Sequence, residues 1–263
     1  MPLTAIQKNI AKILSINRSP ESHLAGGAAI HLNANTQRFS FDLDYFHDSI
    51  ESVAIAFDLD MKRLSNEGYE VEILVTQPGF IQVLISKNNE STKVEWSHDT
   101  AWRFLPVIKD ESVGYQLHPI DLAVNKVLAL IGRSEARDLI DTLFVHKQVL
   151  SLGALCWAAA GKDPGFTPML ILDLIRRRGI IRQEDLKKLN LVENIDLAQF
   201  KQDWLNALQD AEQFIRSRPH DELGCLYYSA NEMKFIGDFS AIETSDAKPH
   251  YGKPYGIKPA FIQ

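Results

Sequence analysis

The chain has 263 residues, of which 45% are hydrophobic and 24% charged, and its formal net charge at pH 7 is −6. This composition is that of an ordinary globular protein and excludes collagen-like, low-complexity and disordered chains. The mild acidity also excludes a protein held to nucleic acid by bulk positive charge, so a nucleic-acid partner has to meet a local patch. Cys156 and Cys225 show neither zinc-type nor disulfide spacing, which favours a reducing, cytoplasmic location.

We expect no secretion signal in the first residues of the chain. Residues 1–16 mix apolar positions with lysines, which predicts an amphipathic helix rather than a signal peptide. The longest uncharged apolar stretch, residues 148–161, is shorter than the roughly 20 residues that a membrane span requires. We therefore expect no membrane partner.

The first half of the chain mixes helix and strand signals. A glycine pair at residues 26–27 opens a short helix, and residues 39–46 alternate apolar and polar side chains as a half-buried strand does. Further strands are predicted at residues 69–76, 80–86 and 92–97, and a helix at residues 50–66. Turn residues between these strands predict a small mixed sheet whose strands are mainly antiparallel and connected by hairpins.

The second half is predicted to be helical from Pro119 onward, because proline suits the first position of a helix. Apolar residues recur at helical spacing in residues 120–131, 135–148, 151–160, 167–178 and 195–215. Residues 224–239 favour two short strands, and the tail from residue 247 is expected to be extended. The predicted fold class is α+β, with a first domain over residues 1–117 and a helical subdomain over residues 118–263.

The most informative local feature is the pair of carboxylates in the strand predicted at residues 39–46. Asp42 and Asp44 occupy positions i and i+2, so both side chains project from the same face of a strand. Two carboxylates placed in this way can share one or two Mg²⁺ ions that also bind substrate phosphates. The preceding Gly26 and Gly27 can present backbone N–H groups to an anion, and together these features predict a site for phosphate and magnesium.

A second Asp-x-Asp sequence provides an internal comparison. Asp58 and Asp60 lie in the helix predicted over residues 50–66, where positions i and i+2 point roughly 200° apart. We therefore expect both to be solvated charges on the helix surface.

A third carboxylate would complete a metal site and could accept the proton of an attacking hydroxyl. Glu95 is the candidate, because it lies in a predicted strand between Val94 and Trp96, whose apolar side chains face the other way. A lone glutamate in a strand is more often a solvent-facing residue, and only the preceding glycine and aspartate pairs favour the functional interpretation.

A lysine and two aspartates lie on faces of two predicted helices that also carry apolar residues. Lys126 has apolar neighbours at helical spacing, so its ammonium group reaches either water or a phosphate. Asp138 and Asp141 share one helix face, and we expect Asp141 to bind Lys126, Arg133 or Arg137 through charged hydrogen bonds.

Four motifs together resemble a known family. They are LAGGAAIHL at residues 24–32, RFSFDLD at 38–44, KVLALIGR at 126–133 and RDLID at 137–141. In this order they resemble the successive motifs of the AbiEii/AbiGii toxin family of nucleotidyltransferases, which belongs to the DNA polymerase β-like nucleotidyltransferase superfamily. The resemblance covers residues 6–147, and the order of the motifs is specific although each motif alone is weak.

The resemblance implies a nucleotidyltransferase core, with a small mixed sheet and helices on one side, followed by a helical C-terminal subdomain. It implies two Mg²⁺ ions, a nucleoside triphosphate as donor, a hydroxyl acceptor such as a tRNA end, and an antitoxin protein as partner. By the same resemblance, the catalytic, metal-binding residues are Asp42, Asp44 and Glu95. The nucleotide-binding residues are Gly26, Gly27, Arg38, Ser40 and Lys126, and the residues beside that lysine are Arg133, Arg137, Asp138 and Asp141.

Two positions depart from the family pattern. Gly27 stands where many members of the superfamily have serine, and Ala28 stands where threonine is frequent in this family. Each departure removes a hydroxyl donor to phosphate, which leaves open a catalytically degenerate relative that binds a nucleotide or a partner. A phosphohydrolase with Asp42 as nucleophile is a third alternative, disfavoured because a glycine pair and a helix precede the aspartate strand.

One basic cluster could guide an RNA backbone, although a solvated helix face is the commoner meaning of such a cluster. It consists of Arg176, Arg177, Arg178, Arg182, Lys187 and Lys188. The histidines show no zinc-binding spacing, so zinc chemistry is not expected.

Overall fold

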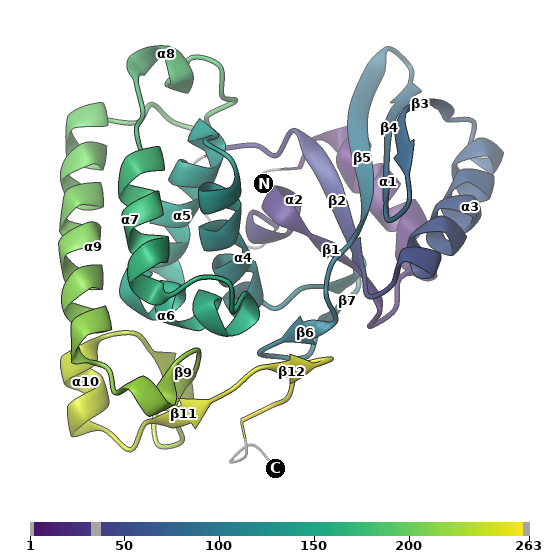
Figure 1. Ribbon diagram of the computed structural model, residues 1–263. Coiled ribbons are helices and arrows are strands. Elements are labelled where there is room, and N and C mark those ends of the chain that lie inside the picture. Colours follow the sequence, from purple (N-terminus) through teal and green to yellow (C-terminus); the bar gives the residue numbers. More distant parts are fainter. Residues whose placement is uncertain (1–2, 33–37, 260–263) are drawn as a thin grey trace. The chain divides into compact units, whose positions relative to one another are not determined.

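The computed structural model describes residues 3–32 and 38–259, and the chain divides into two compact units (Figure 1). The first unit is Met1–His118 together with Pro254–Gly256, and the second is Pro119–Lys253 together with Ile257–Gln263. The chain thus leaves the first unit after His118 and passes back into it near the C-terminus. There the backbone N–H of Tyr255 donates to the carbonyl oxygen of Ala101 at 2.8 Å.

The first unit holds the sheet and the helices that cover it. Its helices are α1 (Ala5–Leu14), α2 (Gly26–Ile30) and α3 (Ile50–Asn66), with a 3₁₀ turn, η1, at Ser15–Asn17. Its strands are β1 (Ser22–Ala25), β2 (Asp42–His47), β3 (Glu70–Gln77), β4 (Phe80–Lys87), β5 (Glu90–His98), β6 (Trp102–Arg103), β7 (Ile108–Asp110) and β8 (Gly114–Gln116). A twelfth strand, β12 (Lys253–Pro254), lies where the chain returns to this unit.

Seven strands form one sheet in the described part of the first unit, in the order β3-β4-β5-β2-β1-β8-β7. The hairpins β3–β4 and β4–β5 are antiparallel, as the turn residues predict. The pairs β2–β5 and β1–β8 are parallel, so the sheet is mixed. The α+β class with a small mixed sheet is confirmed.

The core of this unit lies on one face of the sheet. Leu43 and Tyr45 on β2, and Val94 and Trp96 on β5, have no exposed surface, whereas the residues between them on the same strands are partly exposed. Helices α1 and α3 pack on the buried face, since both contact β2 and β5. This alternation directs the carboxylates of β2 to the opposite face.

The expectation for Asp60 is wrong. Asp58 is exposed, but Asp60 is fully buried and accepts hydrogen bonds from Arg18 at 2.6 and 2.7 Å and from the indole N–H of Trp96 at 2.7 Å. Asn17 donates to the same carboxylate at 2.8 Å. The two aspartates diverge on the helix as the spacing predicts, and the inner one is stabilised by a buried arginine that lies 42 residues away in the sequence.

The second unit is mainly helical, as predicted. Its helices are α4 (Pro119–Gly132), α5 (Ala136–Gln148), α6 (Leu152–Lys162), α7 (Pro168–Arg178), α8 (Gln183–Leu186), α9 (Leu197–Ser217) and α10 (Phe239–Thr244), with a 3₁₀ turn, η2, at His220–Glu222. Strands β9 (Leu226–Ser229), β10 (Lys234–Ile236) and β11 (Lys248–His250) form a small antiparallel sheet in the order β10-β9-β11. In the described part of the tail, residues 247–259, the backbone is mainly extended, and Lys248–His250 pair with β9 as β11.

Helix α6 is the central helix of this unit, because its residues from Leu152 to Ala160 are all buried. It contacts α4, α5, α7 and α9. Small residues allow these close approaches: a Cβ on Gly153 would lie 2.6 Å from the Cβ of Phe214 on α9. The uncharged stretch that the sequence shows at this point is therefore a core helix.

Within residues 3–32 and 38–259, no single helix combines the length and the apolar character needed to cross a membrane. Helices α5 and α6 have enough length and apolar character only when they are taken together, and the chain bends by 111° at the break between them.

Candidate metal centre and nucleotide-binding residues

Two neighbouring parallel strands bring the three predicted carboxylates together. Asp42 and Asp44 project from one face of β2, and Asp44 is the register partner of Glu95 on β5. Atoms from Asp42, Asp44 and Glu95 that could bind a metal all lie within 4.8 Å of one another. The three side chains are partly buried, so a cation at this position would be partly shielded from solvent.

The donor set fits a hard divalent cation. Three carboxylates supply only oxygen ligands, which Mg²⁺ prefers, and their combined negative charge favours a cation strongly. A partly exposed position leaves room for water or substrate oxygens, which Mg²⁺ usually retains as ligands.

Gly26 lies directly beside this cluster. Its φ of +61° is in the left-handed region, which glycine adopts at no steric cost. A Cβ on Gly26 would lie 1.7 Å from Oδ2 of Asp44, closer than any real contact. The glycine is therefore required both by its backbone conformation and by the position of the Asp44 carboxylate.

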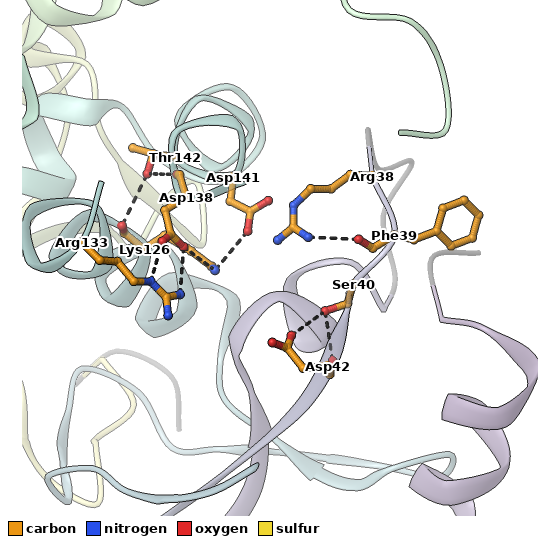
Figure 2. Close-up of polar contacts among 9 residues, drawn as sticks. All are labelled: Arg38, Phe39, Ser40, Asp42, Lys126, Arg133, Asp138, Asp141 and Thr142. Atoms are coloured by element: carbon orange, nitrogen blue, oxygen red, sulfur yellow. Dashed lines mark hydrogen bonds and ion pairs between the residues drawn. The ribbon is translucent and has the colours of Figure 1, made fainter. Parts of the chain in front are cut away.

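Gly27, Arg38 and Ser40 lie together beside Asp42. A Cβ on Gly27 would be 3.0 Å from Nη2 of Arg38 and 3.1 Å from Oγ of Ser40, so these two side chains border the position of the missing serine side chain. The Ser40 hydroxyl donates to the carbonyl oxygen of Asp42 at 3.0 Å and lies 3.4 Å from its carboxylate (Figure 2). Nη1 of Arg38 donates to the carbonyl oxygen of Phe39 at 3.0 Å (Figure 2).

The other predicted residues lie in the second unit, where α4 and α5 bring them together. Nζ of Lys126 is 3.2 Å from Asp138 and 3.0 Å from Asp141, and Arg133 donates to Asp138 at 2.7 Å (Figure 2). Thr142 donates to the carbonyl oxygen of Asp138 at 2.6 Å. Lys126 is thus held by two carboxylates from α5, in agreement with the expectation that Asp141 binds a neighbouring cation.

Asp138 has a pKa below the usual range. Burial alone would raise this pKa, but the charge of Lys126 and the hydrogen bond from Arg133 outweigh burial and lower it. The cluster therefore keeps its ion pairs at neutral pH. Arg137 follows Ala136, the first residue of α5, and is partly buried.

The basic cluster in the second unit is partly occupied by intramolecular contacts. Arg176 forms ion pairs with Asp173 and Glu212, and Arg178 donates to the carbonyl oxygen of Ile131. The side chains of Arg177, Arg182, Lys187 and Lys188 are exposed.

One neighbour of the carboxylates was not predicted from the sequence. Gln82 on β4 is the register partner of Glu95 and donates a hydrogen bond to its Oε1 at 2.5 Å. The available signal was a polar residue between the apolar Ile81 and Val83. The missing information was the pairing of β4 with β5 in this register, which sets the two side chains opposite each other.

Comparison with known proteins gives no match to a family model and no match to a curated protein. Solved structures do match. JHP933 from Helicobacter pylori gives a TM-score of 0.55 at 19% identity, covering 82% of this chain and 94% of that one. A candidate nucleotidyltransferase from H. pylori gives 0.54 at 17% identity, covering 82% and 96%.

A toxin is among the similar structures. MenT4, the nucleotidyltransferase toxin Rv2826c from Mycobacterium tuberculosis H37Rv, gives a TM-score of 0.52 at 16% identity, covering 82% of this chain and 83% of that one. The similarity confirms the fold that the resemblance to the AbiEii/AbiGii toxin family implies. The chain therefore has a nucleotidyltransferase fold with a helical C-terminal region.

Proposed function

We propose that this protein is a magnesium-dependent nucleotidyltransferase that moves a nucleotide from a nucleoside triphosphate to a hydroxyl acceptor on RNA. The observation that carries the proposal is the group of three carboxylates, Asp42, Asp44 and Glu95, on adjacent parallel strands of a nucleotidyltransferase fold. Such a group fits the metal requirement of phosphoryl and nucleotidyl transfer.

The chain's own residues have distinct roles in this proposal. Asp42 and Asp44 would hold the metal ions, and Glu95 would complete the site and accept the proton of the acceptor hydroxyl. The bound ions would neutralise the charge that develops on the transferred phosphoryl group. The backbone at Gly26 and Gly27 would donate N–H groups to the triphosphate.

Polar side chains near the glycines support nucleotide binding despite the two departures from the family pattern. Ser40 and Arg38 border the position next to Gly27 and offer a hydroxyl and a guanidinium group. By the resemblance, Lys126 is the lysine that faces the nucleotide. Its carboxylate partners, Asp138 and Asp141, fix the ammonium group, and Arg133 forms an ion pair with Asp138. By the same resemblance, Arg137 belongs with these two aspartates to the motif that packs beside the lysine.

The acceptor and the biological setting are extensions of the same proposal. MenT4 is described as a nucleotidyltransferase toxin, and the resemblance implies tRNA ends as acceptors and an antitoxin as partner. We accordingly propose a cytoplasmic toxin that modifies tRNA and is neutralised by a small partner protein. Two Mg²⁺ ions would reverse the sign of the local charge of the three carboxylates, so the net charge of −6 does not oppose binding of RNA at this position.

The direct experiment is incubation of the protein with each α-³²P-labelled nucleoside triphosphate, total cellular RNA and Mg²⁺, followed by gel electrophoresis. The expected result is transfer of label to an RNA band, which is lost when EDTA removes the metal. If no triphosphate labels RNA, calorimetry with each triphosphate and Mg²⁺ separates two outcomes. Binding without transfer would identify a catalytically degenerate relative that binds nucleotide. Absence of binding would contradict both the active nucleotidyltransferase and the degenerate nucleotide-binding relative.

A further inference from the structure

Glu95 has a polar neighbour on each side of its strand. Strand β5 lies between β4 and β2, so Gln82 is opposite Glu95 on one side and Asp44 is opposite it on the other. Ile81 and Val83 point to the buried face of the sheet, which leaves Gln82 on the same face as Glu95. The hydrogen bond from Nε2 of Gln82 to Oε1 of Glu95 is 2.5 Å long.

The chemistry of this contact suits a metal-binding carboxylate. A carboxylate has about four lone-pair sites. A single hydrogen-bond donor occupies one of them and leaves the others for a cation. The amide of Gln82 adds no charge, so it fixes the orientation of Glu95 without neutralising it. A lysine or arginine at the same position would form an ion pair with Glu95 and oppose binding of a divalent cation.

We propose that Gln82 is a positioning residue, which acts through Glu95 to orient its carboxylate toward Asp42 and Asp44 and so raises the affinity of this group for a divalent cation. The inference rests on the proposed function, because it assigns Gln82 to the same metal site. Outer partners that hydrogen-bond to metal ligands typically contribute about 10- to 100-fold to metal affinity.

The competing explanation is a cross-strand pair that only stabilises the sheet. Such pairs contribute about 0.2–1 kcal/mol to folding, and their loss would change stability without changing metal affinity. The test therefore needs a direct measurement of metal binding. Mn²⁺ is a suitable probe because it uses the same oxygen ligands as Mg²⁺ and its free form is detected by electron paramagnetic resonance.

The experiment compares Gln82→Met with Gln77→Met in the full chain. Methionine has a volume similar to that of glutamine and has no amide. Gln77 is an exposed residue on β3, so Gln77→Met controls for the chemical change alone. We expect the dissociation constant for Mn²⁺ to rise about tenfold in Gln82→Met and to stay within twofold of wild type in Gln77→Met. If Gln82→Met does not fold, Gln82→Asn, whose amide is one methylene shorter, should give the same rise.

A double-mutant comparison shows whether Gln82 acts through Glu95. In a Glu95→Gln background, the Gln82→Met change should no longer alter Mn²⁺ affinity. An undiminished effect in that background, or equal affinities of Gln82→Met and wild type, would overturn the inference and leave the proposed function intact. Failure of the wild-type protein to bind Mn²⁺ would overturn the proposed function and this inference with it.

Discussion

At the scale of single residues, the candidate site depends on very close packing of backbone against carboxylate. Gly26 tolerates no side chain because Asp44 occupies the position that a Cβ would take. The sequence shows the glycine pair and the aspartate pair as separate motifs. In the structure, the position of Asp44 requires a glycine at residue 26. Asp44 is the register partner of Ala25, the residue that precedes Gly26, so its carboxylate lies against Gly26.

The substitution Gly26→Ala should strongly reduce nucleotide transfer. The new methyl group would force the Asp44 carboxylate away from Asp42 and Glu95, and a displacement of about 1 Å can reduce catalysis on the order of 100-fold. Gly68→Ala is the matched control, because Gly68 has a similar φ of +73° and no atom within 4 Å of its would-be Cβ. Both variants should lose about 1 kcal/mol of stability from the backbone alone.

The measurement is the rate of label transfer together with urea unfolding of both variants. Only Gly26→Ala should lose transfer. Equal transfer rates in the two alanine variants would show that the position of Asp44 is not critical.

At the scale of elements, the buried network of Asp60 connects segments that are remote in the sequence. Arg18 follows η1, Asp60 lies on α3, and Trp96 lies on β5, next to Glu95. The guanidinium group of Arg18 also lies over the Tyr45 ring, 4.5 Å from its centroid. The face of the sheet opposite the carboxylates is thus held by charged hydrogen bonds as well as by apolar packing.

The substitution Asp60→Asn should strongly destabilise the protein. The substitution leaves the buried Arg18 without a counter-charge, and breaking a buried ion pair in this way typically costs about 3–5 kcal/mol. Asp58→Asn, on the exposed side of the same helix, should change the free energy of unfolding by less than about 0.5 kcal/mol. Urea unfolding of both variants checks the difference, and similar stabilities would show that the ion pair contributes little.

Local patterns were sufficient to predict most elements. Alternation predicted β4 and β5, turn residues predicted their hairpin, and Pro119 predicted the start of α4. The parallel pairing of β2 with β5 was not predictable, because it joins segments about 50 residues apart and no local signal sets the register. The short strands β1, β7 and β8 were missed, since three or four residues carry too little periodicity.

The candidate site was predictable to the same extent. Strand alternation places Asp42 and Asp44 on one face of β2. Helical spacing places Asp138 and Asp141 on one face of α5. The proximity of Glu95 to the aspartates, and the bond from Gln82, depend on sheet order, which the sequence does not encode locally. The burial of Asp60 was missed because a helix pattern shows which side chains diverge and does not show which charge finds a buried partner.

At the scale of the whole molecule, stability should depend on pH through buried histidines. His47 on β2 has no exposed surface, and burial, together with the charge of Arg18, lowers its pKa to about 4. The unfolded chain binds a proton at this histidine near pH 6.5, so between pH 6.5 and pH 4 it binds more protons than the folded chain. The stabilisation is present above pH 6.5 and is lost as the pH falls toward 4.

The difference between the folded and the unfolded pKa of His47 should make the protein less stable in mild acid. Lowering the pH from 7 to 5 should reduce the free energy of unfolding by about 2 kcal/mol through His47 alone. The variant His47→Gln should lose this part of the pH dependence, whereas the exposed His98→Gln should keep it. Urea unfolding at both pH values provides the comparison, and an unchanged pH dependence in His47→Gln would contradict the assignment to this histidine.

The role of Asp42 and Asp44 as metal ligands is tested directly by the rate at which label passes from a nucleoside triphosphate to RNA. This rate is compared among Asp42→Asn, Asp44→Asn and Asp58→Asn. Loss of a metal-binding carboxylate should reduce the rate on the order of 1000-fold or more. Asp58→Asn should retain the wild-type rate, and circular dichroism should show the same fold in all three variants. Full transfer activity in a correctly folded Asp42→Asn or Asp44→Asn protein would contradict the assignment of this carboxylate group as the metal site of a nucleotidyltransferase.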